Sequence, residues 1–214
     1  MLKVQCDDLL AGWVRAGACD GAAALPFIDS ELATGLKQRG VPGEAWRPEV
    51  TAAVRNLLRR GVYKPTGRGK PASEYLVNAF VEARFPRIFG LVDLANWASL
   101  VSALPISLID LGRTSAREFV VRTGREGESY VFNAGGQTID LHDLVLVAER
   151  ESDLACGNAV KDSLRTKLSP EARDVMAVIY APPALRERLV STTAMLHAAL
   201  RDQARAGSHA SGVA

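Results

Sequence analysis

The chain has 214 residues, of which 48% are hydrophobic and 23% are charged, and its formal net charge is +2. These proportions suit one globular domain with a sizeable core, and they exclude disorder on a large scale. Because the net charge is small, any attraction to nucleic acid has to come from local clusters of Lys and Arg.

The cysteines and histidines are few and scattered. Cys6, Cys19 and Cys156 are widely spaced and form no CxxC pair, and no histidine has a second ligand at metal-binding spacing. This pattern is typical neither of a disulfide framework nor of a zinc site. We therefore expect a reducing compartment, no metal and no cofactor.

No segment has the composition of a secretory signal or a membrane span. Asp7 and Asp8 stand where a signal peptide needs an apolar run. The most apolar region is interrupted by Asp93, Asn96 and Pro105, so it does not read as a bilayer-spanning helix. We expect a soluble, cytoplasmic protein without membrane partners, and the sequence leaves its oligomeric state open.

The first half of the chain is predicted to be mainly helical. Residues 1–44 predict a short α/β lead-in that packs on the main domain. Three helices follow, over residues 47–61, 74–85 and 92–104. Pro48 fits the first turn of the first helix, Ser73 is placed to cap the second, and the third ends before Pro105.

The second half is predicted to be mainly strands. Short runs rich in Val, Ile and Phe alternate with glycine turns, at 107–111, 118–123, 128–133, 137–141, 144–149 and 175–181. Residues 169–174 predict one capped helical turn, and residues 184–203 an amphipathic helix that covers a sheet face. We expect residues 205–214 to form a flexible tail. Helices followed by a run of strands indicate an α+β fold.

Several motifs in this order resemble one known family. VDLANWASLVSALPISLIDL followed by EFVVRTGREGESYVFNAGGQTIDLHDLVLVAE is similar to the B3/4 editing domain of the bacterial phenylalanyl-tRNA synthetase beta chain. The segments SEYL and GNAVKDSLRTK resemble freestanding members of that family. The resemblance covers roughly residues 45–183. It implies that residues 45–204 form a three-layer B3/4-type α+β domain, with an unusual β-sandwich flanked by helices.

The resemblance also implies a function and several pocket residues. A freestanding B3/4 domain is expected to hydrolyse the ester of a mischarged aminoacyl-tRNA in trans. The pocket asparagine of the family is matched by Asn96, Ser107 stands where the family has a histidine, and Ala177 lies near the position of the glutamate that binds the tyrosine hydroxyl. Without that acid the basis for selecting tyrosine is gone, so we do not expect tyrosine as the substrate.

The segment 157–167, GNAVKDSLRTK, concentrates charged and hydroxyl side chains between two runs that read as buried strands. Ester hydrolysis needs a positioned water and donors aimed at the developing oxyanion, which an acid or hydroxyl and a lysine can supply. The alternative is a solvated loop whose charges pair with one another. We expect catalytic roles for Lys161, Asp162 and Ser163, pocket positions for Gly157 and Asn158, and phosphate contacts for Arg165 and Lys167.

A second basic segment, residues 55–70, contains Lys and Arg but no acidic residue. Its last part predicts contacts of Lys64, Arg68 and Lys70 with an RNA backbone. The alternative, a solvated helix end whose arginines complement the helix dipole, explains Arg59 and Arg60 but not the three later cations.

Three functions therefore remain open from the sequence. The first is an aminoacyl-tRNA deacylase that uses a positioned water, with tRNA or aminoacyl-tRNA as its partner. The second is a non-catalytic tRNA-binding or RNA-binding module. The third is a pocket for a free amino acid or small carboxylate.

Overall fold

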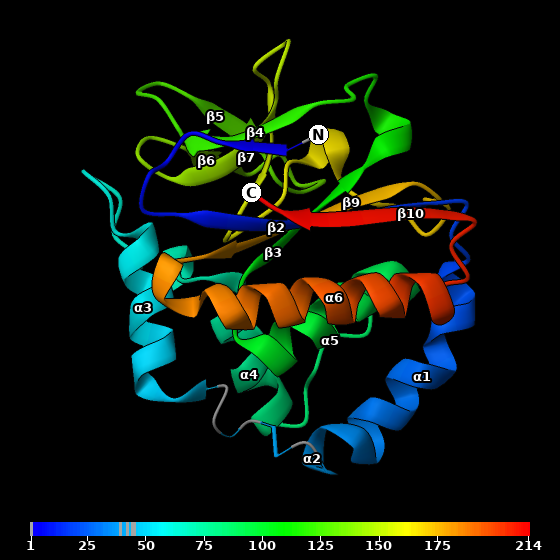
Figure 1. Ribbon diagram of the computed structural model, residues 1–214. Coiled ribbons are helices and arrows are strands. Elements are labelled where there is room, and N and C mark those ends of the chain that lie inside the picture. Colours follow the sequence, from blue (N-terminus) through cyan, green and yellow to red (C-terminus); the bar gives the residue numbers. More distant parts are fainter. Residues whose placement is uncertain (1, 39, 42, 44–45) are drawn as a thin grey trace.

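Two four-stranded β-sheets pack face to face, and helices cover the outer face of one of them (Figure 1). The structure is a computed structural model that describes residues 2–38, 40–41, 43 and 46–214. The predicted domain boundary between residues 44 and 45 lies outside the described residues. Among the described residues, no helix combines the length and the apolar character needed to cross a membrane.

The sheet next to the helices has the strand order β10-β2-β9-β3, and all its neighbours are antiparallel. Its strands are β2 (Leu10–Gly17), β3 (Ile106–Asp110), β9 (Val175–Ala181) and β10 (Ser208–Val213). The outer sheet has the order β1-β4-β7-β8. Its strands are β1 (Leu2–Val4), β4 (Phe119–Thr123), β7 (Val145–Glu149) and β8 (Ala155–Asn158). A separate hairpin consists of β5 (Ser129–Val131) and β6 (Thr138–Asp140).

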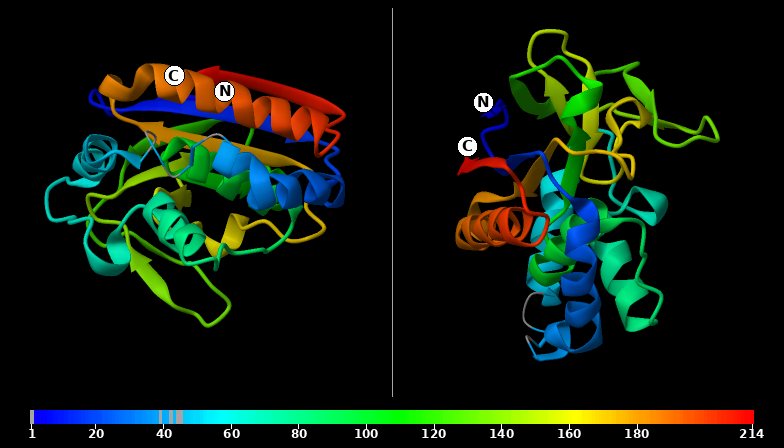
Figure 2. Two further views of the ribbon diagram at one scale, coloured as in Figure 1. Left: turned by 90° about the horizontal axis from the view of Figure 1, so that it is seen from below. Right: turned by 90° about the vertical axis from the view of Figure 1, so that its right-hand side faces the viewer.

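The α-helices gather on one side of the β-sandwich, where α6 runs along the sheet and α5 lies beside it (Figures 1 and 2). They are α1 (Leu25–Ser30), α2 (Leu36–Gln38), α3 (Pro48–Leu58), α4 (Ala72–Val81), α5 (Gly90–Ser102) and α6 (Arg186–Asp202). Further helical turns are η1 (Gly21–Ala24), η2 (Glu31–Gly35), η4 (Gly67–Gly69), η5 (Leu111–Arg113), η6 (Leu164–Thr166) and η7 (Pro183–Leu185).

The two-residue period of the strands divides the core into two parts. In β9, Ala177 and Ile179 belong to the core shared with the helices, whereas Val178 and Tyr180 belong to the core between the sheets. Both faces of this strand are therefore buried, which explains its unbroken apolar sequence. The outcome is the three-layer α+β arrangement that the sequence predicted.

The N-terminal and C-terminal segments are built into the sheets. Residues 205–214 were expected to be flexible, but β10 pairs along its whole length with β2, from Ser208 opposite Gly17 to Val213 opposite Gly12. That prediction is wrong because small polar residues can still supply a full set of backbone hydrogen bonds to a neighbouring strand. The lead-in likewise supplies strands to both sheets, β1 beside β4 and β2 beside β9.

Two local predictions also differ from the structure. Residues 169–174 contain a hydrogen-bonded turn, with the N–H of Ala172 donating to the carbonyl of Ser169 at 3.0 Å, and no helix. Ser73 does not cap α4, because the helix begins at Ala72, two residues earlier than predicted, and Pro71 occupies the capping position. Within the described part of the chain, the buried Oγ atom of Ser73 has no hydrogen-bond partner.

Candidate functional site

The two basic segments singled out in the sequence meet at one cleft of about 510 Å³. One wall is the η4 turn and the first turns of α4, and the other is the segment after β8. We call this space the α4 cleft. It is lined by Gly67, Arg68, Lys70, Pro71, Ala72, Glu74, Tyr75, Asn78, Val160 and Lys161.

A backbone hydrogen bond joins the two walls of the α4 cleft, and an ion pair to α3 fixes one of them. The N–H of Ala72 donates to the carbonyl of Ala159 at 3.0 Å, which joins the start of α4 to the end of β8. Glu74 is nearly buried and accepts two hydrogen bonds of 2.5 Å from the guanidinium of Arg55 on α3. Such a bidentate pair fixes both position and orientation. It gives Glu74 a structural role that composition alone did not reveal.

The α4 cleft combines positive charge with an exposed aromatic ring. Arg68 and Lys70 are exposed on one wall, and Lys161 lies on the other. Tyr75, one turn into α4, has 60% of its surface exposed. Cations beside an accessible ring are the groups that bind the phosphates and stack on the bases of single-stranded nucleic acid.

Lys161 is held in place by the hairpin. Its Nζ atom lies 3.7 Å from the centroid of the Phe132 ring, a cation–π contact. Lys167 reaches the same residue and donates from Nζ to the carbonyl of Phe132 at 3.0 Å. Two predicted loop cations are thus gathered around the end of β5, one of them facing the α4 cleft.

Asp162 does not line the α4 cleft; its carboxyl group turns inward. Oδ2 accepts a hydrogen bond of 3.1 Å from the N–H of Leu108, and Oδ1 is buried without a hydrogen-bond partner among the described residues. Burial raises the pKa of this carboxyl from 3.8 to about 7, and the Leu108 N–H opposes the change only in part. Such a group can hold or release a proton near neutral pH.

Hydroxyl and amide groups surround the Asp162 side chain. Tyr180 donates from its hydroxyl to Ser107 at 3.0 Å, and Ser107 donates to the carbonyl of Asn158 at 2.9 Å. The Asn158 amide donates to the Tyr130 hydroxyl, which in turn donates to the carbonyl of Lys161 at 2.6 Å. The predicted pocket residues Ser107, Gly157 and Asn158 do come together here, but as a packed and buried network.

The other predicted site residues lie elsewhere or already have partners. Ser163 caps η6 by accepting the N–H of Arg165 at 3.3 Å. Arg165 pairs with Glu149 at 2.6 Å. Ala177 is fully buried in β9 on the side of the helices, and Asn96 is half-buried on α5. Lys64 is exposed, next to the α4 cleft in sequence but outside its lining.

Sequence reasoning missed the aromatic residues of the site. Tyr75 sits inside the quoted SEYL segment, and its position on an otherwise apolar helix was the available signal. Phe132 and Tyr130 read as ordinary alternating strand residues, because nothing local reveals which basic side chain a hairpin ring will meet. In the described part of the chain, no three His, Cys, Asp or Glu side chains group as metal ligands.

No family model matches the chain, and no curated protein matches it either. Among solved structures it is similar to an N-terminal fragment of the phenylalanyl-tRNA synthetase beta-subunit from Pyrococcus horikoshii, with a TM-score of 0.46 and 7% sequence identity. The match covers 58% of this chain and 41% of that chain, so the chain spans less than half of its neighbour's length. The chemistry of the α4 cleft therefore has to be judged from its own residues.

Proposed function

We propose that the protein binds single-stranded RNA in the α4 cleft, and that the physiological ligand is the acceptor end of a tRNA. The observation that carries the proposal is the meeting of Arg68, Lys70 and Lys161 around the exposed Tyr75 ring. The motif resemblance to an aminoacyl-tRNA editing domain favours tRNA over other RNA.

The chemistry of the α4 cleft explains how such a strand would be held. Arg68 and Lys70 lie in a segment rich in Gly and Pro, a composition typical of flexible loops. The hydroxyl of Tyr63 fixes this segment by donating a hydrogen bond of 2.7 Å to the carbonyl of Gly69. The cations are thus presented from an ordered turn. Phosphates would contact these side chains while a base stacks on Tyr75, an arrangement that tolerates different base sequences.

Binding by about three cations predicts a definite salt dependence. Release of counterions from a single strand gives a slope of roughly −2 for log K against log salt concentration, when three phosphates are neutralised. Fluorescence anisotropy with a labelled acceptor-end oligonucleotide and with whole tRNA measures this slope. Binding that does not respond to salt contradicts the proposal.

Variants locate the binding to the α4 cleft. Lys70→Gln should weaken binding severalfold and reduce the salt slope by about 1. Tyr75→Ala should weaken binding by roughly tenfold with the slope unchanged, since it removes stacking and no charge. Arg186→Gln, an exposed arginine at the start of α6, is the matched control and should bind like wild type. Equal effects of Lys70→Gln and Arg186→Gln would place binding elsewhere.

Ester hydrolysis in the α4 cleft is a second candidate function, and Lys161, which lines the cleft, is the observation that favours it. Asp162 is buried behind the cleft and would not touch the substrate. In this step a water oxygen attacks the ester carbonyl, its proton passes to bulk water, and the carbon–oxygen bond to the ribose breaks as the ribose oxygen takes up a proton. The positive charge of Lys161 would stabilise the oxyanion.

The two functions separate in one experiment. Purified wild type, Lys161→Ala and Asp162→Asn are each incubated with a panel of correctly and wrongly charged aminoacyl-tRNAs. Release of the amino acid by wild type, lost in Lys161→Ala and kept in Asp162→Asn, supports hydrolysis with Lys161 as the oxyanion-stabilising group. Binding of tRNA without release from any member of the panel leaves RNA binding as the function and excludes the hydrolase.

A further inference from the structure

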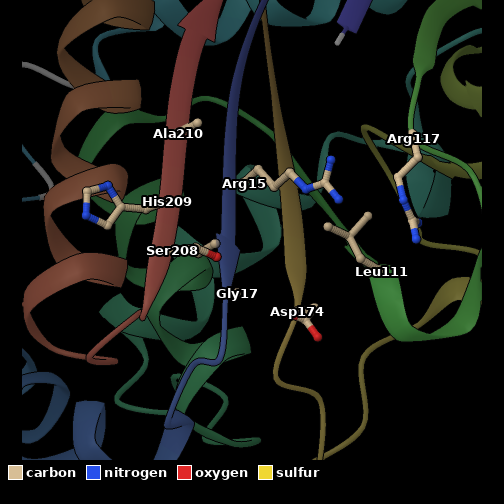
Figure 3. Close-up of a pocket in the computed structure, with 9 residues that line it drawn as sticks. Arg15, Gly17, Leu111, Arg117, Asp174, Ser208, His209 and Ala210 are labelled. Carbon is tan, nitrogen blue, oxygen red and sulfur yellow. The ribbon is translucent and has the colours of Figure 1, made fainter.

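A second cavity, of about 430 Å³, lies at the far end of the helix-covered sheet (Figure 3). It adjoins Gly17 at the end of β2, Asp174 just before β9, Ser208 at the start of β10 and Leu111 just after β3. The α4 cleft, in contrast, adjoins the loop that packs on Ser107 near the start of β3. The two sites are therefore separate.

Arg15 is the unusual residue of this cavity. The alternation of β2 places Arg15 on the same sheet face as Ala11 and Trp13, which pack in the core between the two sheets. Its strand neighbours there are Met176 and Ala210, neither of which carries charge. Arginine on an inner sheet face normally has an acidic partner, because an unpaired charge loses hydration there.

Within the described residues, the Arg15 guanidinium has neither an ion pair nor a hydrogen bond. The acid that lines the cavity, Asp174, accepts a hydrogen bond of 3.2 Å on Oδ1 from the N–H of Ala18. A Cβ atom added to Gly17 would lie 2.7 Å from both Asp174 Oδ1 and Ser208 Oγ, so glycine lets these two polar side chains pack against the strand at the edge of the cavity. The half-buried charge of Arg15 thus faces open space.

A second guanidinium enters the same space. Arg117, from the loop between η5 and β4, extends toward the cavity beside Arg15 and Leu111, whereas the His209 ring points away from it (Figure 3). His209 is engaged with His197 on α6, across 2.9 Å between ring nitrogens. The cavity is therefore a cationic one with two arginines, an apolar wall and one acid, Asp174, at its edge.

We propose that this cavity binds a phosphate group, presented as a phosphate monoester of a small molecule. Two arginine forks match the oxygens of a phosphate, and a monoester carries about −1.5 to −2 charge near neutral pH, which attracts the Arg15 guanidinium that has no acidic partner among the described residues. The free volume exceeds that of a bare anion, and Leu111 supplies a surface for an organic substituent.

Phosphate, adenosine monophosphate and adenosine serve as probes, with chloride added to equalise ionic strength. Isothermal titration and thermal unfolding of the full chain should show binding of both phosphorylated probes and none of adenosine. Equal affinity for phosphate and adenosine monophosphate would mean that the cavity recognises the phosphate group alone. Higher affinity for adenosine monophosphate would mean that the cavity also binds the adenosine part. Absence of a response to both phosphorylated probes overturns the proposal.

Three variants assign the response to the cavity. Arg15→Gln and Arg117→Gln should each weaken phosphate binding by about tenfold or more, since each removes charge-assisted hydrogen bonds. Lys70→Gln, in the α4 cleft, should leave it unchanged, so failure of either site is distinguishable from failure of the other. Without phosphate, Arg15→Gln should unfold at the same temperature as wild type or above it, because the substitution removes an unpaired charge. A lower unfolding temperature together with an unaltered phosphate response would make Arg15 a structural residue.

Discussion

A Cβ atom on Gly157 would lie 2.5 Å from Oδ1 of Asp162. The two residues face each other across an antiparallel bridge at the end of β8, so the inward-turned carboxyl occupies the space that a side chain at 157 would need. Ser107 closes the same space from the other side, with its Cβ 3.3 Å from that position. Position 157 therefore requires glycine because the packed neighbours leave no room for a side chain, and not because of the backbone angles there.

Substitution Gly157→Ala should lower the free energy of unfolding by about 1–3 kcal/mol, the usual cost of forcing an extra carbon into a packed site. Urea denaturation followed by circular dichroism measures the change. Gly135→Ala, in the β5–β6 hairpin, is the matched control, because a Cβ atom there meets nothing closer than 3.5 Å. In an Asp162→Ala background, Gly157→Ala should cost much less. An equal cost in both backgrounds would show that the carboxyl is not the obstacle.

Asp162 should make stability depend on pH. Its pKa is raised by burial from 3.8 to about 7 in the folded protein, so between these values the folded state binds more protons than the unfolded state. The free energy of unfolding therefore falls as pH rises from about 4 to about 7, and changes little from this group outside that window. The decrease should be on the order of a few kcal/mol.

Urea denaturation at a series of pH values tests this dependence. Asp162→Asn keeps the shape of the side chain without its titration, so its unfolding free energy should lose the decline that wild type shows between mildly acidic and neutral pH. The two proteins should differ most at neutral pH, where the variant is the more stable. Parallel curves for the two proteins would mean that Asp162 is ionised in the folded state throughout the window.

Helices and strands could be predicted from the sequence where apolar residues recur at the spacing that places them on one face of the element. Helices α3, α5 and α6 and strands β4, β7 and β9 lie close to their predicted ranges. Strand β2 was missed because its small residues, such as Ala11 and Gly12, give no apolar alternation although both of its neighbours pair with it. Strand β10 was missed for the same reason.

The candidate site could be predicted only in part. Composition singled out the segments that contain Arg68, Lys70 and Lys161, and the fold brings them to one cleft. Composition could not tell which side chains of GNAVKDSLRTK face outward. Asp162 turns in and Lys161 turns out because the chain reverses after β8. This geometry is set by the long-range hydrogen bond from the N–H of Leu108 in β3 to Asp162, and by the contact of Lys161 with the Phe132 ring.

Glu74 should affect the stability of the protein and the proposed RNA binding in opposite directions. Glu74→Gln removes the ion pair with Arg55, which should cost about 1 kcal/mol of unfolding free energy since Arg55 is partly exposed. The same change removes the one acidic side chain from the lining of the cleft, as far as the structure describes it. Affinity for the acceptor-end oligonucleotide should therefore rise severalfold at low salt. Weaker binding by a folded Glu74→Gln protein would contradict the proposed site.

Arg122 and Arg125 offer a direct comparison of a buried and an exposed arginine that share one partner. Arg122 is nearly buried and donates two hydrogen bonds of 2.8 and 2.9 Å to Glu128. It donates two more to Asp153, one to the carboxylate at 2.8 Å and one to the backbone carbonyl at 3.0 Å. Arg125 is 65% exposed and pairs with Asp153. Arg122 and Arg125 both lie close in sequence to the start of the β5–β6 hairpin, and the end of β5 in that hairpin is next to the Phe132 ring that contacts Lys161.

Arg122→Leu should lower the free energy of unfolding by about 3 kcal/mol, because breaking a buried pair leaves its partners without their counter-charge. Arg125→Leu should cost less than about 1 kcal/mol, since water and salt screen an exposed pair. Urea denaturation of both variants beside wild type gives the two values. If the costs were equal, the hairpin would be held by its backbone pairing alone, and loss of Arg122 would leave Lys161 and RNA binding unchanged. A larger cost for Arg122→Leu, accompanied by weaker RNA binding, would show that the buried arginine positions the hairpin for the α4 cleft.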